Sequence, residues 1–142
     1  MTINHSFNDN ICGTGRPFAR PPGRPVQNKR MTGSLHEQQA SLYLKDRGFR
    51  ILEQNYRCRI GEIDLIAEED DYLVFIEVKY RKSDSFGTAA EAVGSAKQKT
   101  IMKCAQVYMK YKSIDFYHKI RFDVVAIDGS RIKLIRNAFG GI

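Results

Sequence analysis

The stretch from Gly61 to Arg81, GEIDLIAEEDDYLVFIEVKYR, constrains the fold more than any other part of this 142-residue chain. Apolar and polar residues alternate along its two arms, and Val, Ile, Tyr and Phe are abundant, which is typical of strands. The acidic run at 69–71 predicts a tight turn, so the arms should form an antiparallel hairpin. The charges are unusual, because Glu77 and Lys79 interrupt a face that is otherwise apolar.

A two-residue loop at positions 70–71 sets the register of this hairpin. Counting back from the loop predicts that Asp64 lies opposite Glu77, and by the same count Glu62 lies opposite Lys79. Such cross-strand side chains share a face, with Cβ atoms about 5 Å apart. Two carboxylates at that separation repel by roughly 3 kcal/mol at an effective dielectric of about 20. Because a divalent cation would turn this cost into a binding site, Asp64, Glu77 and Lys79 are a candidate metal-and-lysine site.

The rest of the body predicts an α/β fold, in the sense of an α+β domain with a mixed sheet and the order α-β-β-β-α-β-β. Helices are expected from Ser34 to the C-cap glycine Gly48 and from Ser95 to about Tyr111. Besides the hairpin arms, strands are expected at 49–56, 120–127 and 131–136, the last two joined by the turn Asp128-Gly129.

Residues 1–32 differ in composition from the body at 33–142, and they hold all four prolines, five basic residues and one acid. Such a segment cannot build a core, so we expect a disordered, basic, Pro-rich tail. It either adds affinity for phosphates or is a passive extension. The tail accounts for +4 of the formal charge of +7, which leaves the body mildly basic.

Charge and hydropathy narrow the class of protein. A pI of about 9.4 favours a polyanionic partner or simply good solubility. No run is apolar enough to span a membrane and the first residues lack a secretory segment, so a cytoplasmic protein without membrane contact is expected. Cys12, Cys58 and Cys104 are an odd number without close spacing, which predicts neither a disulfide framework nor a zinc site.

Two charged residues on the predicted helices can each be interpreted in two ways. Glu37 completes a capping box with Ser34, but it also continues an inward stripe with Ala40 and Leu44 that could approach the sheet. Lys97 projects on the apolar side of the second helix and, as a cation in its first turn, opposes the helix dipole. It is either a site residue or a lysine whose stem lies along the apolar edge.

An Asp followed a dozen residues later by Glu-x-Lys, carried on a hairpin, resembles the PD-(D/E)xK nuclease superfamily. The flanking strings are similar to those of the bacterial UPF0102, or YraN-like, family, and this resemblance covers about residues 33–139. The strings are Gly33-x-x-x-Glu37, Asn55-Tyr56-Arg57, GEIDLIA at 61–67, FIEVKYR at 75–81, Phe86-Gly87 and Lys97-Gln98.

The resemblance implies a restriction-endonuclease-like core and a Mg²⁺- or Mn²⁺-dependent endonuclease that hydrolyses DNA, with branched or distorted structures as expected substrates. Asp64 and Glu77 supply hard oxygen ligands, and the superfamily adds the carbonyl of Val78. Lys79 can orient a water and stabilise charge on phosphorus. Glu37 matches the acid that resolvase-like members carry on their first helix.

The expected partner is nucleic acid, and a homodimer is expected by analogy with Holliday junction resolvases. The basic residues that would contact nucleic acid are Lys97, Arg81, Arg57 and Arg59. A non-catalytic nucleic-acid-binding module that keeps the nuclease fold is the alternative function. A protein-interaction domain is a third reading, and it predicts no salt-dependent DNA binding.

Overall fold

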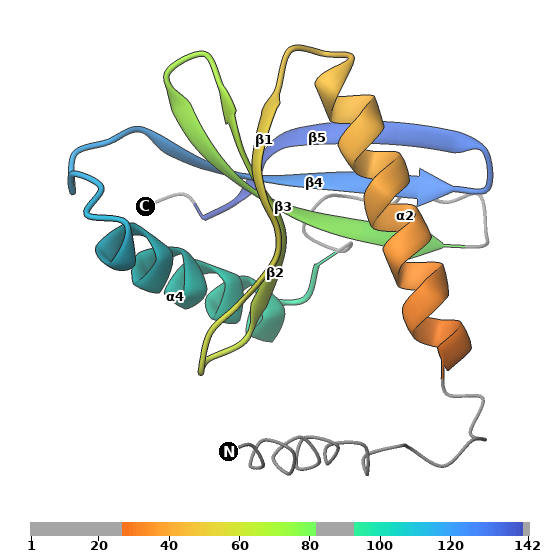
Figure 1. The fold of residues 1–142 in the computed structure, drawn as a ribbon, viewed down its shortest axis with the longest axis horizontal. Coiled ribbons are helices and arrows are strands. Elements are labelled where there is room, and N and C mark those ends of the chain that lie inside the picture. The colour runs from red at the N-terminus through yellow and green to blue at the C-terminus, as the bar shows by residue number, and fades with distance from the viewer. Residues whose placement is uncertain (1–26, 82–92, 141–142) are drawn as a thin grey trace, which may run out of the picture. The chain divides into compact units, whose positions relative to one another are not determined.

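The computed structural model describes residues 27–81 and 93–140 of the chain. It has two compact units, Met1–Met31 and Thr32–Ile142, and the sheet lies in the second. The described elements follow the predicted order α-β-β-β-α-β-β. They are α2 (Gln27–Lys45), β1 (Arg50–Arg57), β2 (Glu62–Glu69), β3 (Tyr72–Arg81), α4 (Ser95–Tyr111), β4 (Ile120–Asp128) and β5 (Arg131–Phe139) (Figure 1).

The five strands form one mixed sheet in the order β1-β2-β3-β4-β5. Neighbouring strands are antiparallel except β3 and β4, which are parallel and are connected through α4. The predicted hairpin register is confirmed, because Glu69 pairs with Tyr72 across the turn. The β2–β3 ladder then continues as far as Leu65 and Ile76, and this end of the ladder positions the candidate site.

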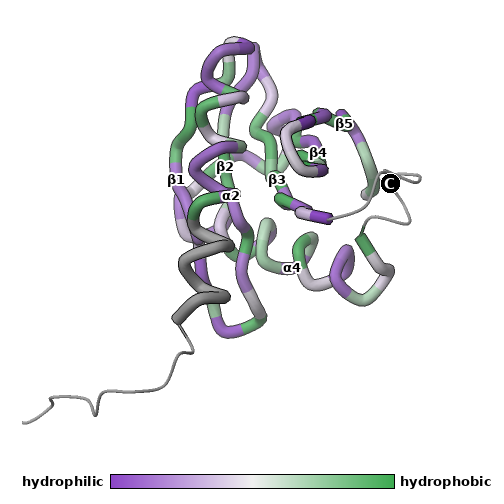
Figure 2. The backbone as a smooth tube through the Cα atoms, turned by 90° about the vertical axis from the view of Figure 1, so that its right-hand side faces the viewer, coloured by the Kyte–Doolittle hydropathy of each residue, from purple (hydrophilic) through white to green (hydrophobic). Residues whose placement is uncertain are grey.

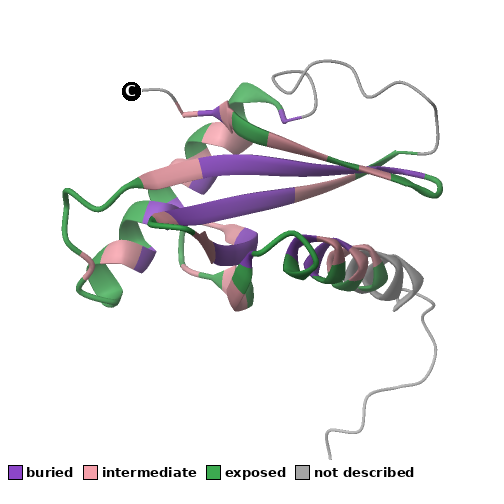
Figure 3. Ribbon diagram, turned by 90° about the horizontal axis from the view of Figure 1, so that it is seen from above, coloured by how far each residue is buried: buried purple, intermediate pink, exposed green. Residues whose placement is uncertain are grey.

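The two helices cover opposite faces of the sheet. Phe75 packs in one core cluster with α4, and Ile76, the next residue along β3, packs in the other cluster with Ala40 and Leu44 of α2. Successive strand residues point to opposite faces, so each face has its own helix. The central strands are therefore buried on both sides, as the colouring in Figure 3 shows.

The first helix begins earlier than the capping signal predicts. α2 starts at Gln27, so Ser34 lies inside the helix and residues 27–32 of the predicted disordered tail are helical. The rest of that tail, residues 1–26, lies outside the described residues. The predicted stop is confirmed, since Gly48 has φ +94° and its N–H donates to the Lys45 carbonyl oxygen at 3.1 Å. Phe49 N–H reaches the Leu44 carbonyl at 3.1 Å, which completes a Schellman motif.

The second helix has the predicted bounds and the predicted amphipathic pattern. Hydrophobic and hydrophilic residues alternate along α4 with the helical repeat (Figure 2). Its buried residues are Ile101, Cys104, Ala105 and Tyr108. Neither α4 nor the described part of α2 is long and apolar enough to cross a membrane.

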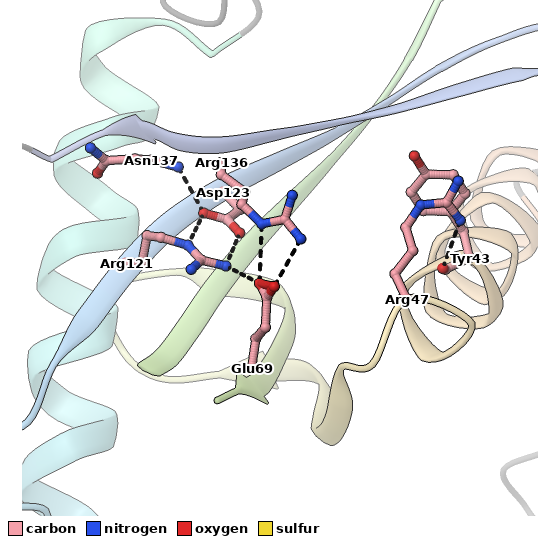
Figure 4. Close-up of polar contacts among 7 residues, drawn as sticks. All are labelled: Tyr43, Arg47, Glu69, Arg121, Asp123, Arg136 and Asn137. Carbon is pink, nitrogen blue, oxygen red and sulfur yellow. Dashed lines mark hydrogen bonds and ion pairs between the residues drawn. The ribbon is translucent and has the colours of Figure 1, made fainter. Parts of the chain in front are cut away.

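A group of charged side chains fixes the turn end of the central hairpin to β4 and β5 (Figure 4). Arg121 contacts Glu69 at 2.6 Å and Asp123 at 2.8 Å, and Arg136 contacts Glu69 at 2.8 Å. The backbone N–H of Asn137 donates to Asp123 at 2.9 Å. Asp123 is fully buried, yet both of its oxygens accept hydrogen bonds, as a structural buried acid requires.

The start of β2 rests directly on α4 through Gly61. A Cβ at this position would lie 2.5 Å from Cγ2 of Thr100. We expect Gly61→Ala to lower the free energy of unfolding by about 1–2 kcal/mol, because the added methyl overpacks the contact. Urea unfolding measures this loss, and Gly61→Ala combined with Thr100→Ser should recover most of it, since serine lacks the clashing methyl. Equal losses in the single and double variants would show that the contact is not the cause.

Candidate active site

Asp64 and Glu77 meet where β2 separates from β3. The ladder ends at the pair Leu65–Ile76, and the next position on each strand carries a carboxyl group. Asp64 turns toward β3, where its Oδ2 accepts the backbone N–H of Val78 at 2.8 Å. Asp64 is 8% exposed and Glu77 5% exposed, and their carboxyl groups are hydrogen-bonded to each other. The predicted carboxylate pair therefore exists, on the sheet face that α4 covers.

Burial changes the protonation of this pair. Loss of hydration, and to a smaller extent the negative charge of Asp64, raise the pKa of Glu77 to about 8. Burial also raises the pKa of Asp64, although the Val78 N–H and the Glu77 hydrogen bond oppose that rise. Both shifts favour the protonated acids, so the pair binds a proton more tightly than two ordinary carboxyl groups do.

Glu77 also has an oxygen that no described residue satisfies. Its Oε2 is buried and has no hydrogen-bond partner among the described residues. Asp123, the comparable buried acid in β4, has partners on both oxygens. Because an unsatisfied buried oxygen costs free energy, the contrast makes Oε2 of Glu77 a candidate acceptor for a group that the described residues do not supply.

Two lysines supply positive charge beside the carboxyl pair. Lys97, in the first turn of α4, places its Nζ 3.7 Å from Oε1 of Glu77. Its amine is therefore directed at the acid pair, which favours the site reading over a lysine that only lies along the apolar edge. Lys79 follows two residues after Glu77 on the same strand, and its charge also lowers the pKa of Glu77.

Glu37 approaches the site from α2. Burial raises its pKa, a hydrogen bond from Asn55 lowers it, and the charge of Asp64 raises it. The capping reading of Glu37 is wrong, because Ser34 is inside the helix. The inward reading is the one the structure supports, since Ala40 and Leu44 continue the stripe into the core.

Asn55 is a site neighbour that sequence reasoning missed. It lies in β1 between Gln54, which pairs with Leu65, and Tyr56, which pairs with Ile63, so it is opposite Asp64. Its φ is +54°, a conformation in which asparagine is enriched among non-glycine residues. An asparagine inside a strand pattern was the available signal, because it is depleted in strands.

The predicted pairing of Glu62 with Lys79 is wrong. At Glu62, β2 no longer pairs with β3. Glu62 pairs instead with Arg57 of β1, and Arg57 Nε lies 3.3 Å from Glu62 Oε2. Arg59 lies in the β1–β2 turn, and Arg81 is exposed at the end of β3.

The donor set suits a hard cation. Two carboxyl groups and the Val78 carbonyl are all oxygen ligands, and the free Glu77 Oε2 is available to one. Within the described ranges, no cluster of three or more His, Cys, Asp and Glu side chains could hold a metal by itself. The set fits Mg²⁺ or Mn²⁺ better than Zn²⁺, because Mg²⁺ binds through one or two carboxylates and completes its shell with water or substrate phosphate.

The sequence of the chain matches the model of a family described as "Uncharacterised protein family UPF0102" over residues 36–127. A UPF0102 protein of Syntrophus aciditrophicus is 52% identical over 120 residues, covering 82% of this chain and 93% of the relative. The chain belongs to family UPF0102. UPF0102 proteins of Lachnoclostridium phytofermentans and Vibrio parahaemolyticus are 44% and 46% identical, covering 79% and 78% of this chain and 95% and 93% of theirs.

The region shared with family UPF0102 contains the whole candidate site. It begins one residue before Glu37, includes the carboxyl pair, and extends past Lys97 into β4. All of β5 and the first nine residues of α2 lie outside the match. The UPF0102 resemblance read from the sequence strings is thereby confirmed.

Proposed function

We propose that this UPF0102 protein is a metal-dependent endonuclease that hydrolyses DNA phosphodiester bonds. The observation that carries the proposal is the buried acid pair of Asp64 and Glu77, in which Oε2 of Glu77 has no hydrogen-bond partner among the described residues and Oε1 lies 3.7 Å from the Lys97 amine. A stable strand end does not need this arrangement. It suits a site where a divalent cation and a phosphate complete the shell.

Each residue of the candidate site has a role in this proposal. Asp64, Glu77 and the Val78 carbonyl hold Mg²⁺ or Mn²⁺. When bound, the metal neutralises phosphate charge and lowers the pKa of a bound water. Lys79 positions the attacking water and stabilises charge that develops on the phosphate oxygens.

Lys97 and Glu37 support the carboxyl pair from the two helices. Lys97 stabilises the ionised form of Glu77, which is the form that binds a cation. Glu37, hydrogen-bonded to Asn55, adds a third acid whose charge acts on Asp64 and would help to orient water at the site. The basic side chains of Arg57, Arg59 and Arg81 then contact the phosphates that flank the scissile bond.

The substrate class and assembly follow from the superfamily resemblance. Branched or distorted DNA is the expected substrate, and a homodimer would place two sites on paired strands. A net charge of +7 adds attraction to any nucleic acid.

The decisive experiment incubates purified protein with labelled four-way junctions, flaps and plain duplex, with Mn²⁺ or with EDTA. We expect metal-dependent cleavage that falls about 100-fold in Lys79→Ala, since charge stabilisation at phosphorus is lost. Lys103→Ala, an exposed lysine of α4, is the matched control and should cut normally. Cleavage that survives Lys79→Ala and Glu77→Ala at the same level would identify a contaminating nuclease.

The non-catalytic alternative has one observation in its favour. In the described parts of the chain the protein alone offers fewer than three clustered side-chain ligands for a metal. A binding module predicts that DNA is held equally well in EDTA and that Mn²⁺ does not raise Tm. Binding and thermal melting, run on the same samples, separate the two functions.

A further inference from the structure

Two cysteines that are far apart in sequence lie together next to the β1–β2 turn. Cys58 is in the turn and Cys104 is in α4, yet their Sγ atoms are 3.4 Å apart. Both are free thiols. Their spacing of 46 residues predicts no pairing, and the folding of the turn onto α4 brings them into contact.

The two thiols have different environments. Burial alone would raise the pKa of Cys58, but hydrogen bonds from the backbone of Ile60 and Gly61 and from Cys104 hold it below the ordinary value. Cys104 is fully buried, and burial together with the bond to Cys58 raises its pKa to about 12. Cys58 is therefore the more nucleophilic of the two cysteines, whereas Cys104 remains a protonated thiol.

A small molecule can reach Cys58 from the surface. A hollow of about 620 Å³ is lined by Cys58, Arg59, Ile60 and Val107. Its apolar walls and single arginine suit a small, anionic disulfide such as oxidised glutathione. Cys58 lines the hollow and is partly exposed, whereas the Cys104 side chain is buried, so Cys58 is the thiol that a reagent can reach.

We propose that Cys58 and Cys104 are a thiol–disulfide exchange site that is oxidised to an intramolecular disulfide by low-molecular-weight disulfides. The Cys58 thiolate attacks one sulfur of the small disulfide, forms a mixed disulfide and releases one small thiolate. Cys104 then gives up its proton to that thiolate and attacks the Cys58 sulfur, which releases the second small thiolate. This thiolate takes up from solvent the proton that Cys58 lost on ionisation. Two protein thiols are oxidised and one small disulfide is reduced to two thiols.

The bond would tie the β1–β2 turn to α4, the helix that carries Lys97. Lys97 and Cys104 are seven residues apart, which places them two turns apart on one side of that helix. The turn also leads into Gly61, which already rests on Thr100. The proposal of an exchange site does not depend on whether the protein cleaves DNA.

The test incubates the full-length protein with excess oxidised glutathione, blocks remaining thiols, and maps peptides by mass spectrometry. We expect a Cys58–Cys104 cross-link that lacks two hydrogen atoms and disappears with dithiothreitol. Closing a loop of this length should raise Tm by about 10 °C in the oxidised protein. Cys12→Ser is the matched control and should form the same cross-link.

Two further variants separate the steps. Cys104→Ala should accumulate a stable glutathione adduct on Cys58, and Cys58→Ser should leave Cys104 unmodified. If Cys104→Ala does not fold, the wild-type peptide map decides alone. The proposal is overturned if wild-type protein keeps both thiols free in excess oxidised glutathione, or if it retains an unresolved adduct on Cys58.

Discussion

Glu77→Gln is expected to abolish divalent-metal binding and to lower metal-dependent DNA cleavage by on the order of 10³-fold. The amide replaces the carboxylate whose Oε2 has no partner among the described residues, so a cation loses one of its two carboxylate ligands. The fold should be retained, because glutamine is a neutral isostere of the protonated acid present at neutral pH. Calorimetric titration with Mn²⁺ and single-turnover cleavage measure the two losses.

Glu68→Gln is the matched control for this prediction. Glu68 lies in β2 at the opposite end of the hairpin, where it forms an exposed ion pair with Arg50. It should bind Mn²⁺ and cleave like the wild type. If Glu77→Gln still binds Mn²⁺ with wild-type affinity, the carboxyl pair is not the metal site and the endonuclease proposal fails.

The hairpin and its carboxyl pair could be predicted because local rules determine them. Alternation assigned the strands, the acidic turn set the register, and the register placed Asp64 beside Glu77. The error begins one step further, where Glu62 pairs with Arg57 instead of Lys79. The alternation of apolar and polar residues indicates that a segment is a strand and which face each residue occupies. It carries no information on where two paired strands separate.

The separation of β2 from β3 depends on contacts between distant parts of the chain. Gly61 rests against Thr100, and Asn55 takes a positive φ opposite Asp64. The Cys58–Cys104 contact also depends on tertiary packing, and the spacing of the two cysteines in the sequence does not predict it. At Ser34 a local rule made the wrong prediction. The capping pattern predicts that the helix begins there, but the helix begins at Gln27.

The metal-free protein should lose stability as pH rises from about 5 to 8. Glu77 has a pKa of about 8 in the folded state and 4.5 as its ordinary value, so in this range the folded state holds a proton that the unfolded state has released. Because the unfolded state binds fewer protons, the free energy of unfolding falls with increasing pH. The stability is fully present below pH 4.5 and is lost as pH passes through about 8.

Urea unfolding of wild type and Glu77→Gln in EDTA isolates this contribution. The difference between the two proteins should change by about 3–5 kcal/mol between pH 5 and pH 8, since glutamine does not titrate. Mn²⁺ should cancel the loss in the wild type alone, because a cation replaces the proton between Asp64 and Glu77. Its apparent affinity should rise about tenfold per pH unit until pH 8 and then level off. Parallel pH profiles for the two proteins would mean that Glu77 is ionised in the fold, and that another group must satisfy its buried oxygen.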